Sequence, residues 1–226
     1  MIVPNNKKFL VYIKTAKTGS SSFVKILEKI SSNSKVNYYE YKDLVSKNEN
    51  LNIGDIIMIV NDQINFFIKE YPNIYKYSYF VLISRNPLNR FISGWKYHNL
   101  SKRKSIDSVI NNPIYPPKKP YEIRWKNEFP KKYWDFFSLY NHVYCGQTET
   151  LVINGKFIID YIIKFEDYNN EMLKFFRHLK LNESDIEKLA IPHEKKNNLN
   201  YLNIKNKISK KLKRKIFEMF ENDYKL

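Results

Sequence analysis

Short apolar runs alternate with helical stripes along the first hundred residues. Phe9–Ile13, 55–60 and 78–84 are each apolar and long enough for a buried strand. Apolar side chains at helical spacing follow the first and third runs, at Phe23, Ile26, Leu27 and Ile30, and then at Leu88, Phe91, Ile92 and Trp95. A helix through Glu70 is expected after the second run. This alternation predicts an α/β fold with a mostly parallel central sheet.

The second half of the chain is less regular. Residues 99–140 contain five prolines among lysines and aromatic residues, which indicates an irregular segment of the kind that often forms a binding loop. A late strand is expected over 157–165, and two further helical stripes follow at Met172, Phe175, Phe176 and Leu179, and at Ile208, Leu212, Ile216 and Phe220. The last stripe lies among lysines, which we interpret as a solvated basic face rather than a nucleic-acid surface.

Composition limits the class of protein. The chain has 226 residues, 43% of them hydrophobic, which predicts a single globular domain over 1–226. A lone cysteine, Cys145, excludes an intramolecular disulfide and a cysteine-rich metal site. No stretch has the ~20 apolar residues of a membrane span, and the first ten residues lack a signal-peptide pattern, so we expect a cytoplasmic protein.

The charge is strongly positive. Lys and Arg number 39 against 23 Asp and Glu, a net charge of +16. Such a balance favours an anionic partner such as phosphate, sulfate or nucleic acid. Lysine is abundant throughout a chain that is also rich in Asn, Ile and Tyr, so a general compositional skew accounts for the charge as well.

The first candidate site is the loop Lys17-Thr18-Gly19-Ser20-Ser21-Ser22 between the first strand and its helix. A helix N-terminus presents unpaired N–H groups to an anion, and glycine allows a close backbone approach. The hydroxyls add donors and Lys17 adds a full charge. The serines also suit helix N-caps, so a capped helix with a polar loop is the alternative. The lysine precedes the glycine, unlike the order in a Walker loop.

The second candidate site follows the third strand. Arg85 lies where that strand ends, which is where ligands bind in open α/β sheets. Pro87 suits the first turn of a helix. Since the apolar stripe of that helix faces the core, Ser93 faces elsewhere, and an arginine fork with a hydroxyl suits a phosphate. Arg90 is interpreted as an ion-pair or surface residue.

Together the two segments resemble the cofactor motifs of sulfotransferases that use 3′-phosphoadenosine 5′-phosphosulfate (PAPS). The two motifs are most similar to those of the carbohydrate sulfotransferases. They read Lys17-Thr18-Gly19-Ser20-Ser21-Ser22 and Arg85-x-Pro87-x-x-Arg90-x-x-Ser93. Later blocks also resemble that family, namely 141–147, 157–167 and Pro192-His193-x-x-Lys196 with Tyr201. The resemblance therefore spans nearly the whole chain.

The resemblance implies roles for these residues. Lys17, Thr18, Gly19, Ser20, Ser21 and Ser22 would hold the 5′-phosphosulfate, with Lys17 stabilising charge on the leaving phosphate. Arg85 and Ser93 would hold the 3′-phosphate, and Lys196 and Tyr201 would close over the nucleotide. It also implies helices on both faces of the sheet, PAPS as the cofactor, a carbohydrate acceptor and no metal.

The general base is less defined. Relatives often place a His or Glu after the middle strand, where this chain has Asp62. Asp62 is our candidate by position, with a helix N-cap as the alternative, and His98 and His142 are further candidates. The acceptor is expected to bind the segment Lys102 to Trp134, whose aromatic side chains suit sugar stacking or core packing: Tyr115, Tyr121, Trp125, Tyr133 and Trp134.

Two other functions fit parts of the pattern. A non-catalytic basic module that binds nucleotides or nucleic acid needs only the phosphate loops and a basic surface, and its binding would depend steeply on salt. A nucleotide kinase would require Mg²⁺. The leading hypothesis is a PAPS-dependent sulfotransferase acting on a carbohydrate hydroxyl.

Overall fold

The computed structural model of the chain divides into two compact units. The first unit comprises Met1–Ser84 and Thr150–Pro192, and the second comprises Arg85–Glu149 and His193–Leu226. The residues that the structure describes are 3–44, 51–98, 104–112, 139–189 and 204–226. The expected single domain over residues 1–226 stays a prediction.

A five-stranded, fully parallel sheet forms the centre of the first unit. Its strand order is β2-β3-β1-β4-β7. In its middle, Ile13 of β1 pairs with Ile59 of β3 and Leu82 of β4. The strand bounds are β1 Phe9–Lys14, β2 Tyr38–Glu40, β3 Ile56–Val60, β4 Ser78–Ser84 and β7 Tyr161–Lys164. The predicted α/β fold is confirmed, and the three early strands lie where the apolar runs placed them.

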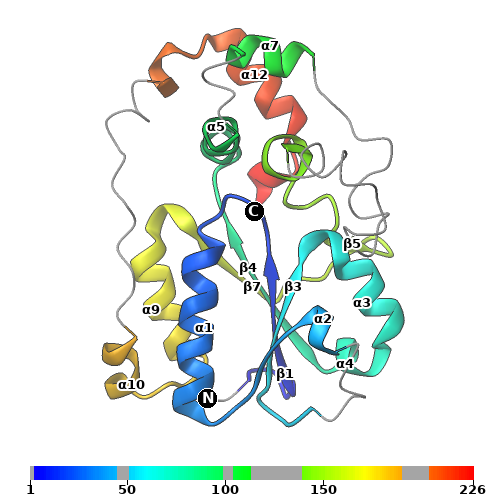
Figure 1. Cartoon of the computed structure of the whole chain (residues 1–226), viewed down its shortest axis with the longest axis vertical. Coiled ribbons are helices and arrows are strands. Elements are labelled where there is room, and N and C mark those ends of the chain that lie inside the picture. The colour runs from blue at the N-terminus through cyan, green and yellow to red at the C-terminus, as the bar shows by residue number, and fades with distance from the viewer. Residues whose placement is uncertain (1–2, 45–50, 99–103, 113–138, 190–203) are drawn as a thin grey trace. The chain divides into compact units, whose positions relative to one another are not determined.

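Helices cover both faces of this sheet (Figure 1). On one face, α1 (Ser20–Ser34) and α9 (Tyr168–His178) pack on the strands, and the Tyr12 ring meets Phe23 edge-on at 4.6 Å. On the other face lies α3 (Ile64–Glu70), where the ring centres of Phe67 and Phe80 are 6.5 Å apart. Both faces of β1, β3 and β4 are therefore buried, which is why these three strands have continuous apolar sequences.

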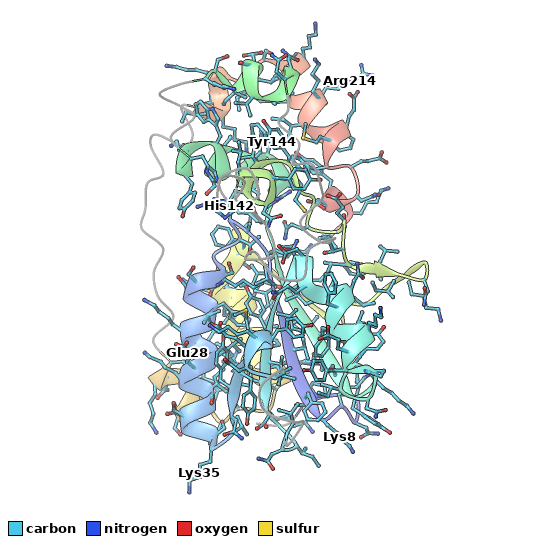
Figure 2. All side chains as sticks on the ribbon, turned by 45° about the vertical axis from the view of Figure 1, so that its right-hand side comes forward. Lys8, Glu28, Lys35, His142, Tyr144 and Arg214 are labelled. Atoms are coloured by element: carbon cyan, nitrogen blue, oxygen red, sulfur yellow. The ribbon has the colours of Figure 1, made fainter. Side chains whose placement is uncertain are left out.

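Short elements complete the first unit. They are α2 (Tyr41–Leu44), the 3₁₀ turn η1 (Asn61–Gln63), α4 (Pro72–Lys76), η6 (Phe165–Asp167) and α10 (Glu183–Lys188). The outer side of α1 is solvent-exposed at Glu28, and Lys35 follows its last turn (Figure 2).

The late strand expected over 157–165 is wrong in its extent. The hairpin strands β5 (Val152–Ile153) and β6 (Lys156–Phe157) come first, and only β7 joins the main sheet. Asp160 separates β6 from β7, because its side chain accepts a hydrogen bond from Phe80 N at 2.8 Å while its own N–H donates to Phe80 O at 2.9 Å.

The described part of the second unit is helical and has its own core. Its elements are α5 (Pro87–Tyr97), α7 (Ile106–Asn111), the π-helical turn η5 (Tyr140–Tyr144), α12 (Lys210–Met219) and the 3₁₀ turn η7 (Asp223–Lys225). The predicted stripes of α5 and α12 are confirmed as buried, at Leu88, Phe91, Ile92 and Trp95 and at Ile208, Leu212, Ile216 and Phe220. No helix in the described ranges is long and apolar enough to cross a membrane.

Candidate functional site

Hydroxyl groups brace the turn between β1 and α1 from inside. Thr15 and Thr18 are buried, and their Oγ1 atoms lie 3.1 Å apart. Thr18 Oγ1 and Ser20 Oγ both donate to Thr15 O, at 3.1 and 3.0 Å. The turn is thus held by its own side chains, and it leaves the end of β1 in a fixed conformation.

Two residues of this turn have left-handed backbone conformations, Lys17 with φ 62° and Gly19 with φ 79°. Gly19 is the N-cap of α1, and no side chain caps that helix. The expectation that serines cap the helix is therefore wrong, because Ser20, Ser21 and Ser22 lie inside its first turn. A left-handed conformation costs a non-glycine residue about 1–2 kcal/mol, so Lys17 is held there against its own preference.

The first turn of α1 directs backbone N–H groups out of the helix. The first N–H groups bonded to Gly19 O are those of Ser22 at 3.1 Å and Phe23 at 3.4 Å. The N–H groups of Ser20 and Ser21 come before these bonds in the helix. They lie at the N-terminal end of α1, which is the positive end of the helix dipole. These N–H groups, with Lys17 earlier in the same turn, form a cradle suited to an anion.

Gly19 is required for a second reason. A Cβ atom added there would overlap the ring of Phe165, which is the first residue of η6. The ring thus fills the space on the inner side of the turn. Backbone conformation and packing both exclude a side chain at this position.

Tyr12 lies behind the turn with its ring fully buried. Burial, together with the neighbouring phenol of Tyr168, raises the pKa of Tyr12 well above its usual range, while the hydroxyls of Ser20 and Thr18 offset part of that effect. Tyr12 is therefore a neutral phenol at any physiological pH and adds no negative charge below the cradle.

The cradle lies at the topological switch point of the sheet. After β1 the chain forms β2 and then β3 on one side of β1, and β4 pairs on the other side of β1. Ligands of open parallel sheets bind outside the carboxyl ends of the strands at such a point. Thr15 Oγ1 also donates to Ile83 O of β4 at 3.4 Å, and Arg85 is the residue that follows β4.

The start of α5 is capped. The Asn86 side chain is the N-cap and accepts from Asn89 N at 3.2 Å, and Pro87 occupies the first turn as predicted. Arg85, directly before the cap, and Ser93, one helical turn beyond Asn89, are each half-buried. Ser93 lies off the buried stripe of α5, as expected.

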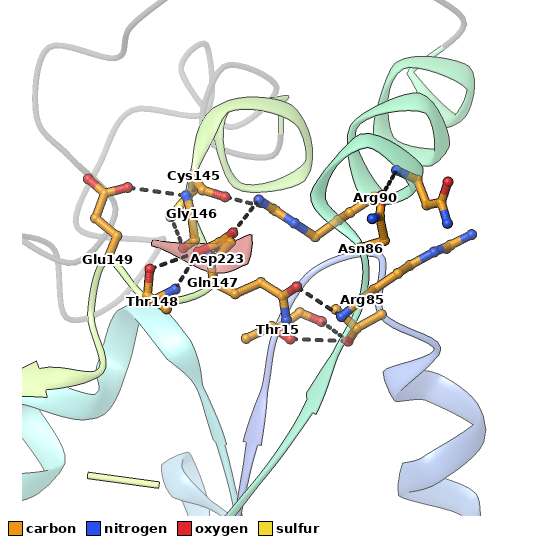
Figure 3. Close-up of polar contacts among 12 residues, drawn as sticks. Thr15, Arg85, Asn86, Arg90, Cys145, Gly146, Gln147, Thr148, Glu149 and Asp223 are labelled. Carbon is orange, nitrogen blue, oxygen red and sulfur yellow. Dashed lines mark hydrogen bonds and ion pairs between the residues drawn. The ribbon is translucent and has the colours of Figure 1, made fainter. Parts of the chain in front are cut away.

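Arg90 is a buried ion-pair residue, which confirms the ion-pair interpretation. Its Nη2 lies 3.0 Å from Asp223 Oδ2, and its Nη1 donates to Cys145 O at 2.6 Å. Asp223 also accepts from Gln147 N at 2.7 Å, and Gln147 Oε1 accepts from Arg85 N at 3.1 Å (Figure 3). Sequence reasoning did not single out Asp223 or Gln147. Gln147 ends a block that resembles the family, but nothing local signals Asp223.

The base candidates lie on different elements. Asp62 is a half-buried residue of η1, directly after β3. It is not the cap of α3, since Gln63 holds that place and no side-chain cap bond is formed there. In the second unit His98 Nε2 and His142 Nδ1 form a hydrogen bond at 2.8 Å; Figure 2 marks His142 on η5.

Several predicted residues lie outside the described ranges. These are Lys196 and Tyr201, and the aromatic residues Tyr115, Tyr121, Trp125, Tyr133 and Trp134. The structure brings Lys17 to Ser22 together in one turn of the first unit, and places Arg85 and Ser93 on the second unit. Within the described residues, no group of three or more His, Cys, Asp or Glu is placed to bind a metal.

A parallel sheet with a turn and a helix N-terminus at its switch point has the architecture that nucleotide-binding α/β proteins share. The sequence profile of the Sulfotransferase family matches residues 1–226, so the chain belongs to that family and is a transferase of sulfuryl groups. Neither the curated proteins nor the solved structures gave a match.

Proposed function

We propose that the protein transfers the sulfuryl group of PAPS to a hydroxyl of a carbohydrate acceptor. Membership of the Sulfotransferase family supports the reaction. The observation that carries the donor assignment is the β1–α1 turn, where Lys17 in a left-handed conformation lies three residues before Ser20, whose N–H group opens α1. The residues of this turn fit PAPS, because an anionic phosphosulfate requires hydrogen-bond donors and positive charge. The backbone N–H groups, the hydroxyls and a lysine supply both.

The two ends of the donor would meet different residues. Thr18, Gly19, Ser20, Ser21 and Ser22 would bind the 5′-phosphosulfate through backbone N–H groups and the hydroxyls of Ser21 and Ser22, with Lys17 as the full charge. Arg85 and Ser93 would bind the 3′-phosphate, and Lys196 and Tyr201 would close over the nucleotide. The donor supplies the sulfuryl group itself.

The chemistry assigns one task to each polar group. The acceptor oxygen forms a bond to sulfur as the bond from sulfur to the phosphate oxygen breaks, and a base removes the hydroxyl proton. Asp62 is the proposed base, with His98 or His142 in its place if Asp62 proves dispensable. Lys17 stabilises the negative charge that develops on the departing phosphate oxygen, as a fixed cation does in phosphoryl transfer.

The acceptor class rests on the resemblance to carbohydrate sulfotransferases. The segment Lys102 to Trp134, which contains the aromatic residues suited to sugar rings, is the proposed acceptor-binding region. A carbohydrate acceptor predicts that saccharides with free hydroxyls are sulfated in preference to simple phenols.

Mass spectrometry of the products tests this proposal. The full chain is incubated with PAPS and, separately, with neutral oligosaccharides, anionic oligosaccharides and a phenol. We expect a sulfated oligosaccharide with wild type and at least a hundredfold slower transfer with Lys17→Ala and with Asp62→Asn. Transfer to the phenol alone would contradict the carbohydrate assignment. Full activity of Asp62→Asn would move the base to the histidine pair.

A further inference from the structure

The carboxylate of Asp223 is the centre of a buried hydrogen-bond network in the second unit (Figure 3). Asp223 is 5% exposed, and its carboxylate accepts from Arg90 Nη2, Gln147 N, Thr148 N and Thr148 Oγ1 at 2.7–3.0 Å. A buried carboxylate costs free energy unless its lone pairs are satisfied and its charge is paired. Here both conditions are met, so the turn at 147–148 is fixed to the last residues of the chain.

Two elements meet at this carboxylate. Arg90 lies in the first turn of α5. Its Nη1 group donates to Cys145 O, next to the 147–148 turn. Its guanidinium also lies 4.8 Å from the centre of the Phe220 ring. Tyr224 is half-buried, and the backbone of Leu88 in α5 hydrogen-bonds its hydroxyl. The C-terminal turn η7 therefore holds the start of α5 from two sides.

The network extends to the backbone of Arg85 through one side chain. Gln147 is 1% exposed, and while its own N–H donates to Asp223, its Oε1 accepts from Arg85 N at 3.1 Å. Arg85 precedes the cap of α5, so the helix offers no partner for its N–H. Figure 3 shows the Arg85 side chain extending away from Gln147, with only its backbone tied to the amide.

We infer that Gln147, anchored by Asp223, is a positioning residue that sets the direction of Arg85 and thereby determines the preference for a nucleotide carrying a 3′-phosphate. This rests on the proposed function, in which Arg85 binds that phosphate. A guanidinium fork recognises phosphate through directed hydrogen bonds, which are lost when the supporting backbone shifts by about 0.5–1 Å. The residue that fixes the backbone therefore sets selectivity without touching the ligand.

A ratio of two affinities separates this role from a purely structural one. The probes are adenosine 3′,5′-bisphosphate and adenosine 5′-monophosphate, which differ only in the 3′-phosphate. Gln147→Met keeps the side-chain volume but removes the acceptor for Arg85 N. We expect it to reduce the preference for the bisphosphate by about tenfold and to leave affinity for the monophosphate unchanged.

Ser209→Ala is the matched control. Ser209 caps α12 in the same unit, accepting from Leu212 N at 3.2 Å, and has no bond to the Asp223 network. Its loss lowers the melting temperature and leaves the preference ratio unchanged. Gln147→Asn, which withdraws the amide by one methylene group, serves as the second variant if the methionine does not fold.

The outcomes are distinct. A reduced ratio in the Gln147 variants with the wild-type ratio in Ser209→Ala supports the inference. An unchanged ratio in the Gln147 variants, or equal losses for both nucleotides, overturns it and leaves the proposed function standing. Failure of wild type to prefer the bisphosphate overturns the proposed function and the inference with it.

Discussion

Arg90 and Asp223 form an ion pair that is almost fully buried although 133 residues separate them in sequence. The side chains are 2% and 1% exposed, and Nη2 lies 3.0 Å from Oδ2. The pair joins α5 to the last turn of the chain, and it orients the 147–148 turn through the same carboxylate.

Removing one partner of this pair should strongly destabilise the protein. Asp223→Ala leaves a buried guanidinium and three N–H or O–H donors without their acceptor. We expect a loss of about 3–5 kcal/mol in the free energy of unfolding, measured by urea titration. The exposed pair Arg214–Glu218 is the control, since Glu218→Gln should change stability by less than about 1 kcal/mol. Comparable losses in the two variants would contradict a structural role for the buried pair.

Gly19 should not tolerate alanine. Gly19→Ala combines a left-handed φ with overlap against the Phe165 ring, whereas Gly155→Ala has a similar φ of 74° but nothing within 4 Å of the added Cβ. We expect Gly155→Ala to cost about 1 kcal/mol and Gly19→Ala to cost about 1–3 kcal/mol more. Chemical denaturation measures both. Equal costs would show that Phe165 gives way freely.

The left-handed conformation of Lys17 should lower the stability of the protein while its side chain is needed for activity. Lys17→Gly relieves the left-handed strain, so we expect the protein to gain about 0.5–1 kcal/mol in stability while losing sulfuryl transfer. Lys35, with φ 53° at the end of α1, provides the control. Lys35→Gly should gain similar stability and keep full transfer. A Lys17→Gly variant that remains active would remove Lys17 from the site.

Three buried phenols should make the protein sensitive to alkali. Burial raises the pKa of Tyr12 and Tyr38 well above the usual value near 10, and burial with the Asp160 charge raises the pKa of Tyr79 to about 12. Folding therefore favours the neutral phenols. Their stabilisation is complete below pH ~10 and is lost as pH rises from there toward the folded-state values.

Phenolate absorbance during a pH titration measures this effect. Tyr12, Tyr38 and Tyr79 should ionise only above pH ~10, together with cooperative unfolding. Ionisation of these three phenols near pH 10 with the fold intact would contradict their raised pKa values.

Local pattern predicted most of the fold. The apolar runs located β1, β3 and β4, and the helical stripes located α1, α5 and α9, because each element buries a face that repeats in sequence. The strand Tyr38–Glu40 was missed because three residues of mixed polarity carry no period. The late strand was predicted too long, over 157–165. Asp160 interrupts it through hydrogen bonds to the backbone of Phe80, and the sequence does not reveal these bonds.

The site was predictable in part. The β1–α1 loop and the Arg85 segment follow from strand ends and helix starts, which are local features. The helix cap was assigned to serines because the left-handed conformation of Gly19 is not visible in the residue types alone. Asp223 was missed because its partners lie 75 to 133 residues away, and only tertiary packing brings them together.

Thermal unfolding with adenosine 3′,5′-bisphosphate tests the central claim most directly. Wild type, Lys17→Ala and the control Lys35→Ala are each melted with and without the nucleotide. At 100 times its dissociation constant the ligand should stabilise wild type and the control by about 2.7 kcal/mol, and Lys17→Ala by clearly less. No shift of wild type at millimolar nucleotide, or an equal shift in all three proteins, would contradict a PAPS site at the β1–α1 turn.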